Sequence, residues 1–81
     1  MNYKALNSNH IKLGAHGQLD YDAKEGVVLI PPADTKVFLH WLNENGKMTA
    51  TYTLTHSTVV YSKIRIINGS ANQISIHAIT L

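Results

Sequence analysis

The stretch at residues 37–54, VFLHWLNENGKMTATYTL, decides the fold class, because it has the pattern of a single β-hairpin. Asn45-Gly46 lies between two apolar-rich runs, and this dipeptide favours a type I′ turn, in which both central residues have positive φ. A two-residue turn pairs Glu44 with Lys47 and fixes the register. The pairs on one face are then Trp41 with Ala50, Leu39 with Tyr52 and Val37 with Leu54. We predict that this face forms part of the core.

The opposite face of the predicted hairpin is semi-apolar. Its cross-strand pairs are Leu42 with Thr49, His40 with Thr51 and Phe38 with Thr53. Such a face is unfavourable in water and is more often covered by another sheet or subunit than left exposed. The sequence therefore predicts an interface made by Phe38, His40, Leu42, Thr49, Thr51 and Thr53.

Composition sets limits on the class of protein. The chain has 81 residues and no cysteine, so neither a disulfide nor a thiolate metal site stabilises it, and oligomerisation is an expected source of stability. Charged residues make up 15% of the chain and the formal charge is +2, which gives no basic stripe for nucleic acid. No apolar run is long enough to span a membrane, and no signal-peptide pattern follows Met1. We expect synthesis in the cytoplasm, without nucleic-acid or membrane partners.

The rest of the chain also has the pattern of short strands. Residues 1–9 lack periodicity and are predicted to form a loose N-terminal arm, with residues 10–81 as one β domain. Residues 27–30 are apolar throughout, which predicts a strand buried on both faces, and Pro31-Pro32 ends it. Further strands are expected at residues 10–13, 19–22, 59–67 and 73–81. Six or seven short strands with frequent turns predict an all-β fold, a small antiparallel β-sandwich of the jelly-roll kind.

The last two predicted strands favour a hairpin across the loop at residues 68–72. In that register Ile66 faces Ile74 and Ile64 faces Ile76. The opposite face then gathers aromatic and basic groups, suited to a carbohydrate or to an acidic protein surface. This predicted polar patch consists of Tyr61, Lys63, Arg65 and His77.

Catalytic and metal-binding patterns are weak. His40, His56 and His77 fall in different predicted strands, and no His-x-His or His-x3-His spacing joins the histidines. Asp20 and Asp22 share one side of a strand, where an acidic edge that resists aggregation is the simpler interpretation. No nucleophile elbow, Cys-His pair or phosphate-binding glycine loop occurs. We therefore expect a protein that is not an enzyme, with no cofactor and no catalytic residue.

In its general features, and without a diagnostic motif, the chain resembles the small β-rich accessory proteins of bacteriophage particles. The resemblance is carried by the cysteine-free composition, the arm, Ile30-Pro31-Pro32-Ala33 and the terminal strand at residues 74–81. It implies a structural protein of the virion surface, a capsid-decoration or fibre component, that forms a homo-oligomer such as a trimer and binds a capsid or tail protein through its arm and a sheet face. A carbohydrate-binding module and a phage-encoded inhibitor of a host protein are the alternatives.

Overall fold

The computed structural model describes residues 7–81, which form eight β-strands and no helix. The first strand already includes residues 7–9, which the sequence analysis assigned to the arm; the remainder of the predicted arm lies outside the described residues. The strands are β1 (Asn7–Leu13), β2 (Gln18–Asp22), β3 (Val27–Ile30), β4 (Val37–Leu42), β5 (Met48–Thr53), β6 (Thr58–Val60), β7 (Lys63–Asn68) and β8 (Ile74–Thr80).

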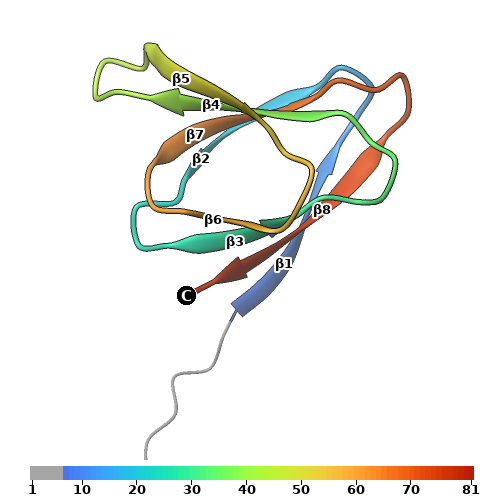
Figure 1. Cartoon of the computed structure of the whole chain (residues 1–81), viewed down its shortest axis with the longest axis horizontal. Coiled ribbons are helices and arrows are strands. Elements are labelled where there is room, and N and C mark those ends of the chain that lie inside the picture. Colours follow the sequence, from blue (N-terminus) through green and yellow to red (C-terminus); the bar gives the residue numbers. More distant parts are fainter. Residues whose placement is uncertain (1–6) are drawn as a thin grey trace, which may run out of the picture.

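The strands form two antiparallel four-stranded sheets, shown as two layers in Figure 1. One sheet has the order β1-β8-β3-β6 and the other has the order β2-β7-β4-β5. The pairs β1·β8, β2·β7, β3·β6 and β4·β5 are nested, as in one long hairpin that has been rolled up. This nesting is the topology of a jelly roll. The predicted all-β, jelly-roll-like sandwich is confirmed, with eight strands in the described residues where six or seven were expected.

The core lies between the two sheets and is aliphatic. Alternate residues along β3, β4, β7 and β8 are buried, as a strand with one face on a core requires. Leu29, Leu39, Ile64, Ile66 and Ile76 are all completely buried. The two inner faces fill the space between the sheets with close-packed side chains.

The register of the hairpin made by β4 and β5 is confirmed at four positions, but its turn differs from the prediction. Phe38, Leu39, His40 and Trp41 pair with Thr53, Tyr52, Thr51 and Ala50. In the turn Gly46 has positive φ and Asn45 does not, so the turn is not type I′. The side-chain oxygen of Asn43 accepts from the N–H groups of Asn45 and Lys47, which favours a longer turn with glycine in the left-handed region.

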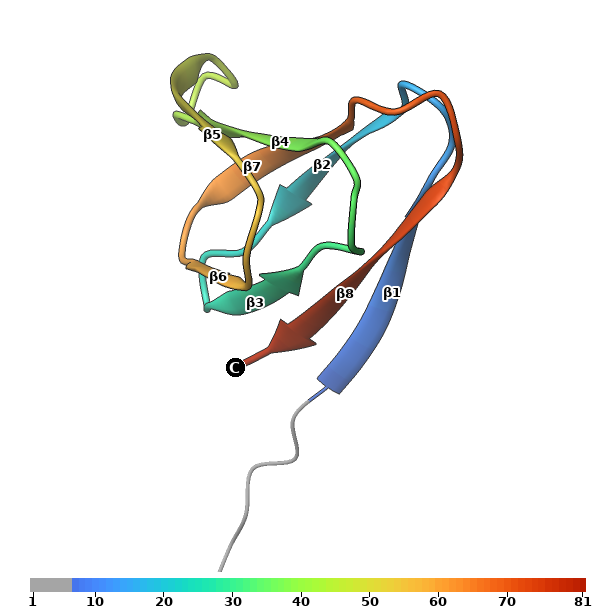
Figure 2. The ribbon, with the colours of Figure 1, turned by 45° about the vertical axis from the view of Figure 1, so that its right-hand side comes forward.

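The predicted core face of that hairpin is only partly internal. Val37, Leu39 and Leu54 are buried, and Trp41 packs partly buried against the core. Tyr52 is 40% exposed and Ala50 is exposed, because β5 is the last strand of its sheet. Both views place β5 at the extremity of the sandwich, away from the opposite layer (Figures 1 and 2).

The predicted hairpin between residues 59–67 and 73–81 is wrong. The first of these segments is divided into β6 and β7, which lie in different sheets, and β7 and β8 also lie in different sheets. β7 pairs with β2 and β4, whereas β8 pairs with β1 and β3. Alternating isoleucines present an apolar face to any partner strand, so the alternation could not identify which strand is the neighbour.

Asn68 fixes the crossover between β7 and β8. It is completely buried, and its amide nitrogen lies 3.1, 2.9 and 2.8 Å from the carbonyl oxygens of Leu13, Gly14 and Asn72. Its side-chain oxygen accepts from the N–H and the hydroxyl of Ser70. One side chain therefore holds the β1–β2 and β7–β8 loops together at this end of the sandwich.

Candidate functional site

The outer face of the β2-β7-β4-β5 sheet carries the residues for which the sequence predicts an interface. Because Val37 and Leu39 point into the core, Phe38 and His40, which alternate with them along β4, point outward. Phe38 lies opposite Thr53 and His40 opposite Thr51, as predicted. Phe38, His40 and Leu42 are half-buried, while the threonines are exposed. We call this surface the docking face; its role as an interface stays a prediction.

Thr49 departs from its expected place on this surface. A bulge between Trp41 and Leu42 puts Leu42 opposite Met48, so Thr49 is the extra residue of β5. The Thr49 hydroxyl donates to the carbonyl of Trp41 over 3.3 Å. The predicted pair of Leu42 and Thr49 is therefore wrong.

The docking face continues onto β7 through Ile67, and Gly69, just after this strand, lies beneath the Phe38 ring. Ile67 lies opposite Phe38 and is half-buried, which enlarges the apolar centre. A Cβ built on Gly69 would lie only 2.5 Å from Cε2 of Phe38, so the phenyl ring covers this glycine. Phe38, Ile67 and Leu42 form the apolar part of the docking face.

An ion pair forms the polar border of the docking face. Arg65 lies opposite both His40 and Asp20, and its Nε and Nη2 donate to the two carboxylate oxygens of Asp20 over 2.7 and 3.1 Å. These hydrogen bonds to Arg65 lower the pKa of the Asp20 carboxyl, and the same contact raises the pKa of Arg65. This pair could not be identified from the sequence pattern, which does not place β2 beside β7.

The predicted polar patch is divided by the fold. Lys63 and Arg65 both lie on β7, but His77 lies on the outer face of the other sheet. There the His77 ring stacks on His10, with centroids 4.8 Å apart, and hydrogen bonds with the Ser8 hydroxyl. The four residues of the predicted patch therefore do not form one surface.

Tyr61 follows β6 and lies over a tight turn. A Cβ built on Gly26 would lie 2.7 Å from Cε1 of Tyr61, and Gly26 has a φ of 99°. The rest of the Tyr61 side chain is open to solvent, with the residue 65% exposed.

A second apolar surface, which was not among the predicted ones, lies on the outer face of the other sheet. Val28 lies opposite Ile79 on one side and Val59 on the other, and Ile30 lies opposite His77. Val28 and Ile30 alternate along β3 with buried Val27 and Leu29, so the Val28 and Ile30 side chains point away from the core. The prediction that residues 27–30 are buried on both faces is wrong for the single chain. We call this surface, made by Val28, Ile30, Val59 and Ile79, the opposite face.

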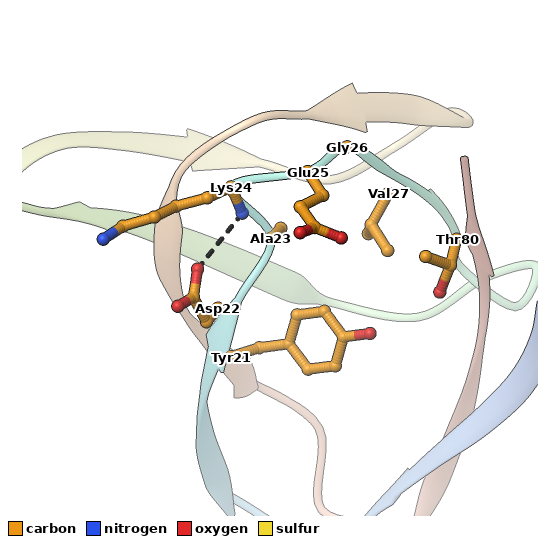
Figure 3. A pocket seen from close by; sticks show the side chains of 8 residues that line it. All are labelled: Tyr21, Asp22, Ala23, Lys24, Glu25, Gly26, Val27 and Thr80. Carbon is orange, nitrogen blue, oxygen red and sulfur yellow. Dashed lines mark hydrogen bonds between the residues drawn. The ribbon is translucent and has the colours of Figure 1, made fainter.

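Three adjoining open clefts lie at the end of the sandwich formed by the β2–β3, β4–β5 and β6–β7 turns. The first, of about 300 Å³, has Tyr21 pointing towards Thr80 and the Glu25 carboxylate above it (Figure 3). The second, of about 380 Å³, lies between Tyr21, Leu42 and Lys63. The third, of about 310 Å³, is lined by Lys24, Leu42, Asn43, Glu44, Tyr61, Ser62 and Lys63.

Residues 7–81 contain no group of three histidine, cysteine, aspartate or glutamate side chains arranged to hold a metal ion. Within the same residues no helix is long and apolar enough to cross a membrane.

Comparison with known proteins supports the fold. No family model and no curated protein matches the sequence. The crystal structure of a cupin domain from Bordetella pertussis Tohama I superimposes with a TM-score of 0.65, over 99% of this chain and 84% of that one. The two sequences are 14% identical, so the likeness concerns the fold alone. The chain is similar to a cupin domain in its jelly-roll architecture.

Proposed function

We propose that the chain is a non-enzymatic assembly module that docks onto a protein partner through the docking face. The observation that carries the proposal is the half-buried apolar pair of Phe38 and Ile67 on an outer face, with the ion pair of Asp20 and Arg65 next to it and Leu42 farther along the same face of β4. An apolar centre inside a polar border is the usual arrangement of a protein–protein interface.

The kind of partner follows from the sequence resemblance. In a bacteriophage particle it would be a capsid or tail protein, with this chain at the virion surface. Jelly rolls occur in viral capsid proteins, in lectins and in cupins, so the fold is compatible with this role without implying it. The non-enzymatic part of the proposal rests on the missing catalytic spacings in the sequence.

The experiment compares two apolar-to-glutamate changes on different outer faces. The full chain is co-expressed with the structural proteins encoded by neighbouring genes, and complexes are isolated by co-sedimentation. We expect the wild type and Val59→Glu on the opposite face to co-sediment, whereas Phe38→Glu does not. Equal loss in both variants, or no complex with the wild type, would contradict the proposal. Circular dichroism of each variant reports whether the fold is retained.

A phage-encoded inhibitor would use the same face with a different partner. In that case Phe38→Glu abolishes binding to a host enzyme, and the particle proteins do not bind the wild type.

Carbohydrate binding is a second candidate, supported by the cleft of about 310 Å³ beside Tyr61. Tyr61 is 65% exposed, and Lys63, Glu44 and Asn43 supply hydrogen-bonding groups around it. Trp41 is unsuited to stacking on a sugar, because it packs partly buried against the core. On a glycan array, Tyr61→Ala is expected to remove any signal of the wild type while Tyr52→Ala retains it. An array without wild-type signal contradicts this candidate.

A further inference from the structure

The edge strand β5 has features that the docking face does not explain. It is the last strand of the β2-β7-β4-β5 sheet, so it has a neighbour on one side only. All six of its residues are exposed, and none of them is charged. Figures 1 and 2 show it at the outer end of the sandwich, clear of the other sheet. An open, uncharged edge of this kind is a template for pairing with another strand.

The other three edge strands carry the features that prevent such pairing. β2 has Asp20 and Asp22, β1 has Lys12, and β6 has only three residues. Charged side chains and short strands are the usual protection of a sheet edge. Among the described edges, β5 alone has six residues without a charge.

The backbone of β5 presents hydrogen-bonding groups to this open edge. The Leu54 N–H donates to the Val37 carbonyl over 2.8 Å, so the peptide groups of Leu54 point towards β4. Because inward and outward pairs alternate along an antiparallel strand, the N–H and C=O groups of Thr51 and Thr53 point away from β4. The bulge at Thr49 lies outside this regular segment.

We propose that β5 pairs antiparallel with β5 of a second copy of this chain, about a two-fold axis at Tyr52. In this register Thr51 of each copy lies opposite Thr53 of the other, and each such pair exchanges two backbone hydrogen bonds. The two Tyr52 side chains meet across the axis on the inner side of the sheet, and Ala50 of each copy lies opposite Leu54 of the other.

The occupant is a second copy because the edge is complementary to itself. Threonine meets threonine on one side and tyrosine meets tyrosine on the other, so no like charges face each other and the cross-strand pairs are favourable ones. An isologous contact of this kind closes as a pair. It therefore gives a dimer, and a trimer would need a different surface.

This inference goes beyond the proposed function, because it uses the backbone groups at the open edge of β5, whereas docking uses side chains on the outer face of the same sheet. Self-pairing joins two sheets edge to edge and leaves Phe38 and His40 accessible on both copies. Phe38→Glu is therefore expected to leave self-pairing unchanged, so the failure of one proposal does not imply the failure of the other.

The experiment measures the mass of the full chain by sedimentation equilibrium up to about 1 mM, the range in which a small interface associates. We expect the wild type to pass from monomer to dimer with concentration. Tyr52→Lys and Tyr52→Glu place like charges across the axis, so each alone is expected to weaken association on the order of tenfold or more. Their equimolar mixture restores the dimer, because opposite charges then meet. The matched control, Tyr61→Lys, changes an exposed tyrosine away from the edge and dimerises like the wild type.

Thr51→Pro tests the backbone contact without a new charge. It removes an N–H that points to the open edge and leaves the ladder with β4 intact, so it is expected to be a folded monomer. This variant decides the question if the Tyr52 variants lose their circular dichroism spectrum. A wild type that is monomeric throughout, a dimeric Thr51→Pro variant, or folded charge variants that do not associate when mixed would overturn the proposal. If β5 pairs only with a strand of another protein, the proposal that its partner is a second copy of this chain is wrong.

Discussion

Trp41 and Tyr52 meet edge to face, with ring centroids 6.2 Å apart and planes at 90°. They are opposite-strand neighbours on the inner side of the hairpin, where the sheet extends beyond its partner layer. Trp41 is the single tryptophan of the chain, so its fluorescence reports this contact.

Removing the tyrosine ring should weaken the hairpin. Tyr52→Ala loses the aromatic contact, for which we expect a decrease of about 0.5–1.5 kcal/mol in the free energy of unfolding. Urea denaturation followed by Trp41 fluorescence, at a concentration where the protein is monomeric, measures it. Tyr61→Ala is the control, with a smaller expected loss because Tyr61 is mostly exposed. An equal loss in both variants would show that the contact with Trp41 is not stabilising.

Asn68→Ala should be among the most destabilising single changes in the described residues. It removes the donor that faces the carbonyls of Leu13, Gly14 and Asn72 at a completely buried position. Removing the donor to one buried and two part-buried hydrogen bonds predicts a loss of about 1–3 kcal/mol. Thermal and urea denaturation measure this loss, and Asn45→Ala in an exposed turn serves as the control. A loss below that of Asn45→Ala would contradict the role of Asn68 at the crossover.

The ion pair of Asp20 and Arg65 predicts a pH dependence of stability. The hydrogen bonds from Arg65 lower the pKa of Asp20 in the folded state. A lowered pKa contributes stability above the unfolded value of about 4, and this contribution is lost as pH falls through the folded value. The wild type should therefore exceed Asp20→Asn in Tm at pH 7, and the two should converge in acid.

The control for this effect is Asp34→Asn, since Asp34 forms no ion pair within residues 7–81. Its Tm difference from the wild type should not follow the same pH curve. A constant difference between wild type and Asp20→Asn from pH 7 to pH 2 would show that ionisation of Asp20 does not stabilise the fold.

Gly69 should control the position of Phe38 on the docking face. In Gly69→Ala the new methyl group would meet the phenyl ring at 2.5 Å and the Lys36 carbonyl at 3.2 Å. We expect a loss of stability of about 1–3 kcal/mol together with weaker partner binding, because the ring must move. Gly14→Ala is the matched control, since no atom lies within 4 Å of its added Cβ. Unchanged partner binding in Gly69→Ala would show that the ring position is unimportant.

The parts of the fold that depend on local pattern were predictable. The pairs of Phe38 with Thr53 and His40 with Thr51 follow from alternation around a short turn. The turn type could not be predicted in the same way, because it depends on which backbone N–H groups donate to the Asn43 side chain. The neighbours of Ile64 and Ile76 were not predictable either, since alternation shows that a face is buried and not which strand lies beside it.

The same limit applied to the candidate surfaces. The pairing of Asp20 with Arg65 and the separation of His77 from Lys63 both follow from strand order, which the sequence pattern leaves open. The outer apolar surface at Val28 and Ile30 could have been predicted from the sequence. An apolar strand in so short a chain indicates a face that the chain itself cannot cover.

The docking face is tested most directly by histidine footprinting of the complex with the co-sedimenting structural protein. The five histidines lie in three different parts of the surface. His40 lies on the docking face, His10 and His77 lie on the outer face of the other sheet, and His16 and His56 lie in exposed loops. Acylation with diethyl pyrocarbonate, read by mass spectrometry, compares the free protein with its complex. We expect protection of His40, with the reactivity of the other four histidines unchanged. Protection of His10 and His77 with His40 unchanged would contradict it.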